Sequence, residues 1–172
     1  EFFSLYGFNK SHAVAYAIDS YYAAWLYTYH PREWIATVLQ SENNSPNGLA
    51  KTIREVKVLG YKFAPSDINY SGEEWDYNPE RNAFIPPLSS IKGVGGKAME
   101  EIIEARPFRN LRELFFNEEG KWRHSKVNKT CFGALCQIEA FASLQEFQDG
   151  DLENHRQLYH LIVDNYEQIR KS

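Results

Sequence analysis

The spacing of hydrophobic residues predicts a mostly helical chain. In the first sixty residues apolar side chains recur three and four positions apart, which is the period of an α-helix. The pattern predicts helices over residues 13–29, 32–41 and 49–59, with a turn at 43–48. Pro31 opens the second helix and Gly60 ends the third. The first helix carries more aromatic residues than one face can hold, so we expect it to be covered on most sides.

The period changes after Gly60. Alternation of apolar and polar residues predicts short strands over residues 61–65, 73–77 and 82–85, with a hairpin turn at 78–81. Helical spacing then returns around residues 111–115, over 129–138 and over 152–169, with Asn128 as the cap of the second of these helices. The predicted fold class is therefore mainly α with a small antiparallel β element.

The segment 88–106 is the most informative part of the chain. Its centre is the turn Gly93–Val94–Gly95, and apolar residues at helical spacing lie on both sides of that turn. They are Leu88 and Ile91 before it and Met99, Ile102 and Ile103 after it. This arrangement predicts two short helices packed against each other across a tight bend.

The same turn has the chemistry of an anion site. Glycine adopts backbone angles closed to other residues and lets another molecule approach the peptide closely. The N–H groups at the start of the following helix carry partial positive charge, and Lys92 and Lys97 flank them. A glycine C-cap followed by an ordinary surface helix would also explain the glycines. The two lysines and the apolar pairing favour a turn that binds phosphates of a nucleic-acid backbone.

Composition limits the possible partners. The chain has 172 residues, 43% of them hydrophobic, and a net charge of -4, which argues against a uniformly basic nucleic-acid binder. Residues 92–129, however, carry nine Lys or Arg against six Asp or Glu, whereas residues 144–172 carry three against six. This asymmetry fits a local contact surface with an acidic tail. No apolar run approaches the ~20 residues of a membrane span, so we expect no membrane partner.

The two cysteines predict no disulfide and no metal site. Cys131 and Cys136 are five positions apart on a predicted helix, so their side chains point in different directions. We expect both to be buried thiols in a reducing compartment. The chain begins with Glu1 in place of Met, which is expected of a piece of a longer protein.

Four blocks in order resemble the alpha subunit of bacterial replicative DNA polymerase III, the C-family polymerases. The blocks are residues 6–13 with 16–17, residues 59–60 with 65–69, residues 90–95 with 102–106, and residues 127–129 with 140–141 and 144. Four departures from the family pattern are visible. Leu5 and Glu139 stand where the family has glycine, Ala142 replaces an aspartate, and Pro86–Pro87 shorten the turn into Leu88. The departure at Glu139 leaves the second hairpin element as a degenerate packing unit.

The resemblance implies a helical fingers subdomain followed by a helix-hairpin-helix DNA-binding subdomain. The implied boundaries are 1–57 for the fingers portion, 58–88 for a small β connector, 89–144 for the helix-hairpin-helix region and 145–172 for a C-terminal amphipathic helix. Residues implied to contact the nascent base pair and incoming deoxynucleotide are Tyr6, Asn9, Lys10, Ser11 and His12. Residues implied to contact duplex DNA are Lys92, Gly93, Val94, Gly95, Lys97, Asn128 and Lys129.

The chemistry of synthesis is expected elsewhere in the complete polymerase. The resemblance implies that catalytic aspartates and Mg²⁺ belong to a palm that this chain does not match, so we predict no catalytic residue, no metal ligand and no polymerisation by this chain alone. We expect the protein in the cytoplasm of a bacterial or phage-infected cell. Alternatives are a stand-alone helix-hairpin-helix DNA-binding adaptor without catalysis and a structural protein–protein module.

Several other polar residues are expected to be ordinary surface. His124 and Lys126 lie in a predicted polar loop at residues 117–125 and just beyond it. Either side chain could contact phosphate, but solvated surface is the expected outcome. Three carboxylates have no spacing typical of a metal site and are predicted to be structural surface residues. They are Asp67, Asp76 and Glu80.

Overall fold

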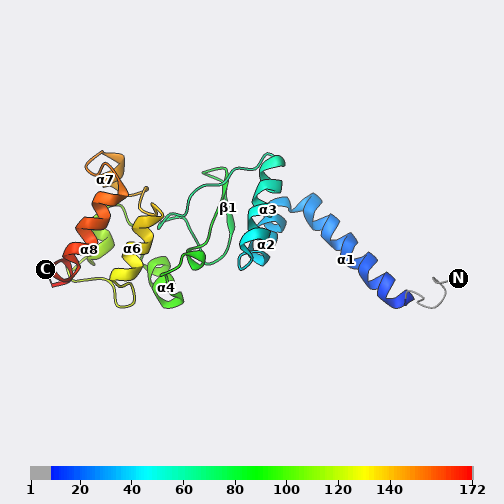
Figure 1. Cartoon of the computed structure of the whole chain (residues 1–172), viewed down its shortest axis with the longest axis horizontal. Helices are drawn as coiled ribbons and strands as arrows, with labels where there is room; N and C mark the ends of the chain where they lie inside the picture. The colour runs from blue at the N-terminus through cyan, green and yellow to red at the C-terminus, as the bar shows by residue number, and fades with distance from the viewer. Residues whose placement is uncertain (1–8, 172) are drawn as a thin grey trace.

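A computed structural model describes residues 9–171 (Figure 1). It is mainly helical with one two-stranded antiparallel sheet, which confirms the predicted fold class. In chain order the elements are α1 (Lys10–Tyr29), α2 (Pro31–Ser41), α3 (Pro46–Val58), β1 (Asp76–Asn78), β2 (Ala83–Ile85), the 3-10 helix η2 (Leu88–Ser90), α4 (Gly96–Ala105), α5 (Leu111–Phe115), α6 (Lys129–Gln137), α7 (Gln145–Gln148) and α8 (His155–Lys171).

Local capping chemistry fixes where the first helices begin. The side chain of Asn9 accepts from the Ser11 amide and caps α1. Ser45 caps α3 in the same way by accepting from the amide of Gly48, and Pro46 occupies the first turn. The prediction of a turn through residue 48 is therefore wrong at its C-terminal end, because α3 begins three residues earlier than expected.

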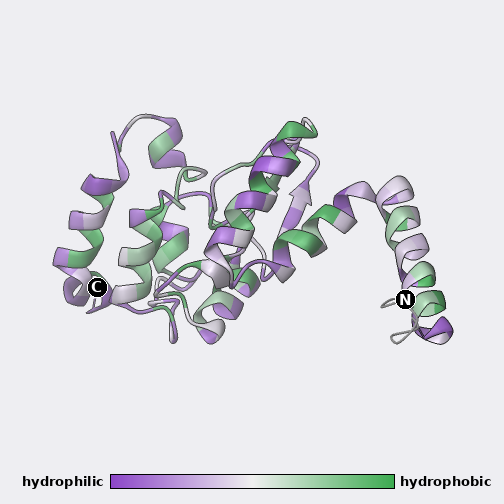
Figure 2. Cartoon of the chain, turned by 45° about the vertical axis from the view of Figure 1, so that its right-hand side comes forward, coloured by the Kyte–Doolittle hydropathy of each residue, from purple (hydrophilic) through white to green (hydrophobic). Residues whose placement is uncertain are grey.

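Within residues 9–171, helix α1 is largely exposed. It contributes no buried residue, and Tyr16, Tyr21 and Tyr29 are each more than 60% exposed. Figures 1 and 2 show α1 projecting away from the other helices and the sheet. The expectation of cover on most sides is wrong for the described residues, because no side chain of α1 is buried among them.

A small core joins α2 and α3 to the sheet. Ile35, Leu39, Val56, Trp75 and Phe84 form it. In the sheet, Tyr77 of β1 lies opposite Phe84 of β2. The predicted strand over residues 61–65 makes one bridge, between Phe63 and Phe84, and it does not continue as a strand. Pro65 lies two residues after Phe63 and has no amide N–H to extend the pairing.

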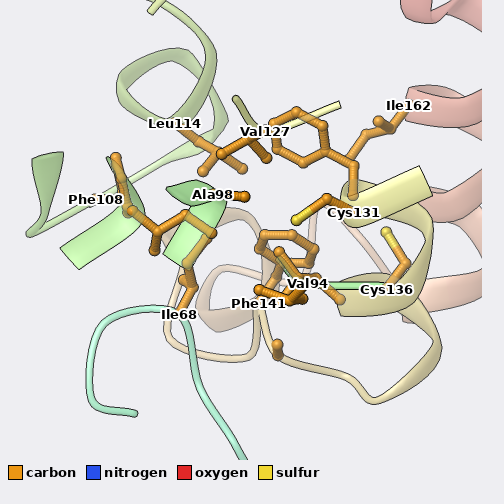
Figure 3. Close-up of a cluster of buried hydrophobic side chains, with 14 of the residues drawn as sticks. Ile68, Val94, Ala98, Phe108, Leu114, Val127, Cys131, Cys136, Phe141 and Ile162 are labelled. Atoms are coloured by element: carbon orange, nitrogen blue, oxygen red, sulfur yellow. The ribbon is translucent and has the colours of Figure 1, made fainter. Parts of the chain in front are cut away.

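The larger core fills the C-terminal half. Helices α6 and α8 pack face to face, and Gly133 of α6 leaves room for Tyr159 of α8. Leu158, Ile162 and Tyr166 of α8 are buried in the same cluster as the hairpin residues Leu88 and Ile102. Ile68, from the segment expected to be a connector, belongs to this cluster as well (Figure 3). Residues 65–72 and α8 are thus packed into one body with the helix-hairpin-helix region.

A buried polar network joins Asp67 and Asn69 to Ser143 and Phe108, which lie far along the chain. The carboxylate of Asp67 accepts from Ser143 Oγ at 2.8 Å and pairs with Arg81 at 3.3 Å. Asn69 donates to the carbonyl of Phe108 and accepts from its amide, both at 2.8 Å. Asp67 is 1% exposed, so the prediction of a surface carboxylate is wrong for Asp67, whereas Asp76 and Glu80 are exposed as expected.

Candidate nucleic-acid interface

The predicted tight turn is present between η2 and α4. The amide of Ile91 donates to the Leu88 carbonyl, and the amide of Val94 donates to Ile91 at 3.0 Å. Gly93 has φ +105°, and a Cβ added there would lie 3.1 Å from the Cβ of Ala134 in α6. Gly93 is therefore required both by the backbone of the turn and by its close packing on α6.

Gly95 has a different role. It is the N-cap of α4 with φ −79° and ψ 157°, which any residue can adopt, and no side chain caps this helix. A Cβ added at Gly95 or Gly96 would meet nothing within 4 Å. Among residues 9–171, no protein acceptor is found for the amides of Gly95, Gly96 and Lys97. Three N–H groups at the positive end of a ten-residue helix thus belong to exposed residues and lack an acceptor in the described chain.

These amides lie beside a cleft of about 320 Å³. Its lining comes from two segments, the turn with the start of α4 and the loop that leads into α6: Gly93, Gly95, Gly96, Lys97, Ala98, Lys126, Asn128 and Cys131. Asn128 serves as the predicted cap of α6, because its Oδ1 accepts from the Cys131 amide at 3.0 Å. Lys126, predicted to be solvated surface, is exposed and lines this cleft.

The other predicted DNA contacts divide into two groups. Lys92 and Lys129 are exposed, but neither lines the cleft, and Lys92 faces a separate hollow of about 490 Å³ beside Ser90 and Gln137. Val94 is 7% exposed and its amide is bonded within the turn. Figure 3 shows its side chain in the core. The prediction that Val94 contacts DNA therefore needs correction, because packing takes both its side chain and its amide.

One carboxylate organises the loop beside the cleft, and the sequence did not single it out. Glu101 of α4 accepts from the amides of Ser125 and Lys126 at 3.0 Å, from the Val127 amide at 3.4 Å and from Ser125 Oγ at 2.7 Å. Burial raises the pKa of Glu101, but these hydrogen bonds together outweigh burial and lower the pKa below its ordinary value. The hydrogen bonds from the loop thus favour the charged form of Glu101.

His124 is a core residue, so its prediction as solvated surface is wrong. It is 6% exposed, with Nε2 against the Leu114 carbonyl and Nδ1 at 3.1 Å from Glu101. Burial lowers the pKa of His124, and the two acceptors, which favour the charged ring, offset burial only in part. The ring also packs edge-on against Phe132 and Trp122.

The described residues predicted to contact nucleotide lie at the N-terminal end of α1. Lys10, Ser11 and His12 form its exposed first turn, where Ser11 Oγ donates to Asn9 at 2.7 Å and the His12 ring lies 4.5 Å from that of Tyr16. Tyr6 lies outside the described residues. Figure 1 shows this end of α1 far from α4.

Both thiols are buried and free, as predicted. Burial raises the pKa of Cys131 to about 11 and that of Cys136 to about 12. In the part of the chain that the structure describes, no group of three or more His, Cys, Asp or Glu is placed to hold a metal ion. Residues 9–171 also include no helix that is both long and apolar enough to cross a membrane.

Comparison with known families decides what this turn is. A sequence model described as the helix-hairpin-helix motif matches residues 60–149, which include the turn, the cleft and the polar network around Asp67. The chain belongs to the helix-hairpin-helix family. The match begins before η2, in agreement with the packing of residues 65–72 against the helix-hairpin-helix core.

Three relatives of this helix-hairpin-helix chain share one name. It is 35% identical over 144 residues to DNA polymerase III subunit alpha of Campylobacter jejuni, covering 81% of this chain and 12% of the relative. The Chlamydia pneumoniae protein of that name is 31% identical over 167 residues, covering 95% and 13%. The Thermus aquaticus protein is 37% identical over 118 residues, covering 66% and 10%. The resemblance found in the sequence is confirmed, and the chain spans about an eighth of its relatives' length.

One departure in this helix-hairpin-helix chain has a visible structural consequence. Glu139 follows the C-cap of α6 with φ +61°, a left-handed conformation that suits glycine and strains other residues. The backbone thus keeps the shape of a glycine turn although its residue has a side chain.

Proposed function

We propose that this chain binds duplex DNA through the phosphate backbone, without reading bases, as part of a C-family replicative DNA polymerase. The observation that carries the proposal is the start of α4, where the amides of Gly95, Gly96 and Lys97 have no acceptor in the described chain and border an open cleft. Amides at a helix N-terminus favour a negatively charged oxygen. Phosphate contacts position a protein on DNA and carry no base information.

The shape of the site supports a backbone contact over a side-chain contact. Gly95 and Gly96 present no Cβ, and the space next to them is empty to 4 Å. A phosphate oxygen can therefore come within hydrogen-bond distance of the peptide. Lys97 adds positive charge on the same side, and Gly93 fixes the direction of the turn by its packing on α6.

The place in a polymerase rests on the relatives' name and on the motif order. In this proposal residues 9–12 and Tyr6 form part of a fingers subdomain and contact the incoming deoxynucleotide, and a palm-bearing remainder supplies the catalytic aspartates and Mg²⁺. The chain alone then performs no primer extension, and it works in the cytoplasm of a bacterial or phage-infected cell. In a reconstituted polymerase, Lys10→Ala should raise the apparent KM for nucleotide while leaving DNA affinity unchanged. Loss of DNA affinity with an unchanged KM would contradict this placement.

The test of DNA binding is a salt titration. The chain, Lys97→Ala and the control Lys121→Ala are each titrated with two duplexes of unrelated sequence at several salt concentrations. Lys121 is exposed, lies outside the cleft and pairs with Glu119, so its removal changes the net charge equally. Loss of Lys97 should lower affinity equally for both duplexes and reduce the slope of log affinity against log salt by about one. Equal slopes for the chain and Lys97→Ala, with intact folding, would contradict the proposal.

A further inference from the structure

We propose that the phosphate cleft has a second wall, formed by Lys126, and that Glu101 is the residue that positions it. The proposal rests on the function proposed above and goes further, because it assigns a contact and a positioning residue that the family motif does not point to. The evidence is the hydrogen bonding around Glu101, the anchoring of the loop on either side of Lys126, and the lining of the cleft.

The carboxylate of Glu101 accepts hydrogen bonds from the backbone of the loop at residues 125–127. Its two carboxylate oxygens accept from three consecutive amides, those of Ser125, Lys126 and Val127, and from the Ser125 hydroxyl. A carboxylate that accepts several amide hydrogens at once fixes the conformation of the segment that donates them. Glu101 itself projects from α4, the helix whose first turn carries Gly96 and Lys97. The two walls of the cleft are thus joined through one side chain.

The loop is also fixed immediately after Lys126. Val127 is 2% exposed and lies in the core cluster that contains Val94 of the turn (Figure 3). Asn128 is fixed by its capping bond to α6. On the other side, His124 is buried and contacts Glu101. Lys126 is therefore an exposed cation on a backbone held at both ends, and it lines the same cleft as Lys97 and the free amides.

Charge alone and positioning predict opposite results for one variant. Replacing Glu101 with Gln removes a negative charge near the cleft, so an account based on net charge alone predicts tighter DNA binding. If Glu101 acts by holding Lys126, the same replacement should weaken binding, because glutamine keeps one acceptor oxygen where the carboxylate has two, and three backbone amides of the loop donate to that carboxylate. The sign of the change separates the two accounts.

The experiment measures duplex affinity against salt for Lys126→Ala, Glu101→Gln and the double variant, again with Lys121→Ala as the control of equal charge. Lys126→Ala should reduce the salt slope by about one and lower affinity equally for unrelated duplexes. Glu101→Gln should lower affinity severalfold in the otherwise unchanged chain and have no further effect when Lys126 is already Ala. Amide hydrogen exchange of Lys126 and Val127 should become faster in Glu101→Gln.

The outcomes separate this inference from the proposed function. If the chain and Lys97→Ala behave as predicted above while Lys126→Ala binds like the control, only the second wall is wrong. Tighter or unchanged binding by Glu101→Gln, or an equal loss with and without Lys126, overturns the positioning role. If Glu101→Gln does not fold, Ser125→Ala removes a single hydroxyl bond to Glu101 and should show a smaller loss that again disappears in the Lys126→Ala background.

Discussion

The two glycines of the turn should respond in opposite ways to alanine, and the structure allows both effects to be worked out. In Gly93→Ala the alanine must keep φ +105°, and its Cβ would lie 3.1 Å from the Cβ of Ala134. A left-handed conformation costs about 1–2 kcal/mol for a residue with a Cβ. With the crowding against α6, we expect the free energy of unfolding to fall by about 2–3 kcal/mol.

Gly95→Ala should leave stability nearly unchanged. Its φ of −79° suits alanine, and the new Cβ meets nothing within 4 Å. Alanine caps a helix less well than glycine but also loses less entropy on folding, and these opposing effects are each about 0.5–1 kcal/mol. On the DNA side, however, the methyl group stands where a phosphate would approach. Loss of one charge-assisted hydrogen bond, about 1.5–3 kcal/mol, corresponds to roughly a ten- to hundredfold weaker complex.

The assay pairs urea unfolding with duplex binding for both variants, and Gly72→Ala is the matched control. A Cβ at Gly72 would have ordinary contacts, at 3.7 Å from the nearest atom, and Gly72 does not line the cleft. The reasoning fails if Gly95→Ala folds normally and binds duplex DNA as tightly as the Gly72→Ala control. It also fails if Gly93→Ala is as stable as Gly95→Ala.

Two further predictions concern stability. Glu139→Gly should raise the free energy of unfolding by up to about 1 kcal/mol, because it relieves a φ of +61°; thermal unfolding tests this, and a lower Tm would contradict it. Acid should destabilise the chain in two steps. Since the pKa values of His124 and Glu101 are lowered by folding, the unfolded chain binds protons more readily, and stability falls as the pH drops below 6.5 for His124 and below 4.5 for Glu101. Urea unfolding at several pH values should show a weaker dependence below pH 4.5 in Glu101→Gln, and an unchanged dependence would count against the role of Glu101.

The helices and the turn could be predicted because their signals are local. Asn128 sits directly before α6 and caps it, Pro31 opens α2, and the Gly93–Val94–Gly95 turn separates two apolar faces that do pack together. These signals depend on neighbours within a few positions, so periodicity and capping rules find them.

The burial of polar residues could not be predicted, because their partners are distant in sequence. Asp67 bonds to Ser143, 76 positions away, and His124 contacts Glu101, 23 positions away. Aspartate is usually exposed and histidine is intermediate between buried and exposed residue types, so residue type alone does not predict that either is buried. The place of Lys126 at the cleft depends on Glu101 in the same way. Only folding brings these segments together.

The most direct test of DNA binding by the cleft is an NMR titration of the chain with two duplexes of unrelated sequence. If the cleft binds the DNA backbone, amide shifts concentrate at Gly95, Gly96 and Lys97, with a second group at Lys126. Both duplexes then give the same pattern, and added salt reverses it. Shifts that differ between the duplexes, or that concentrate on α1 or α8 and leave the start of α4 unchanged, would contradict it.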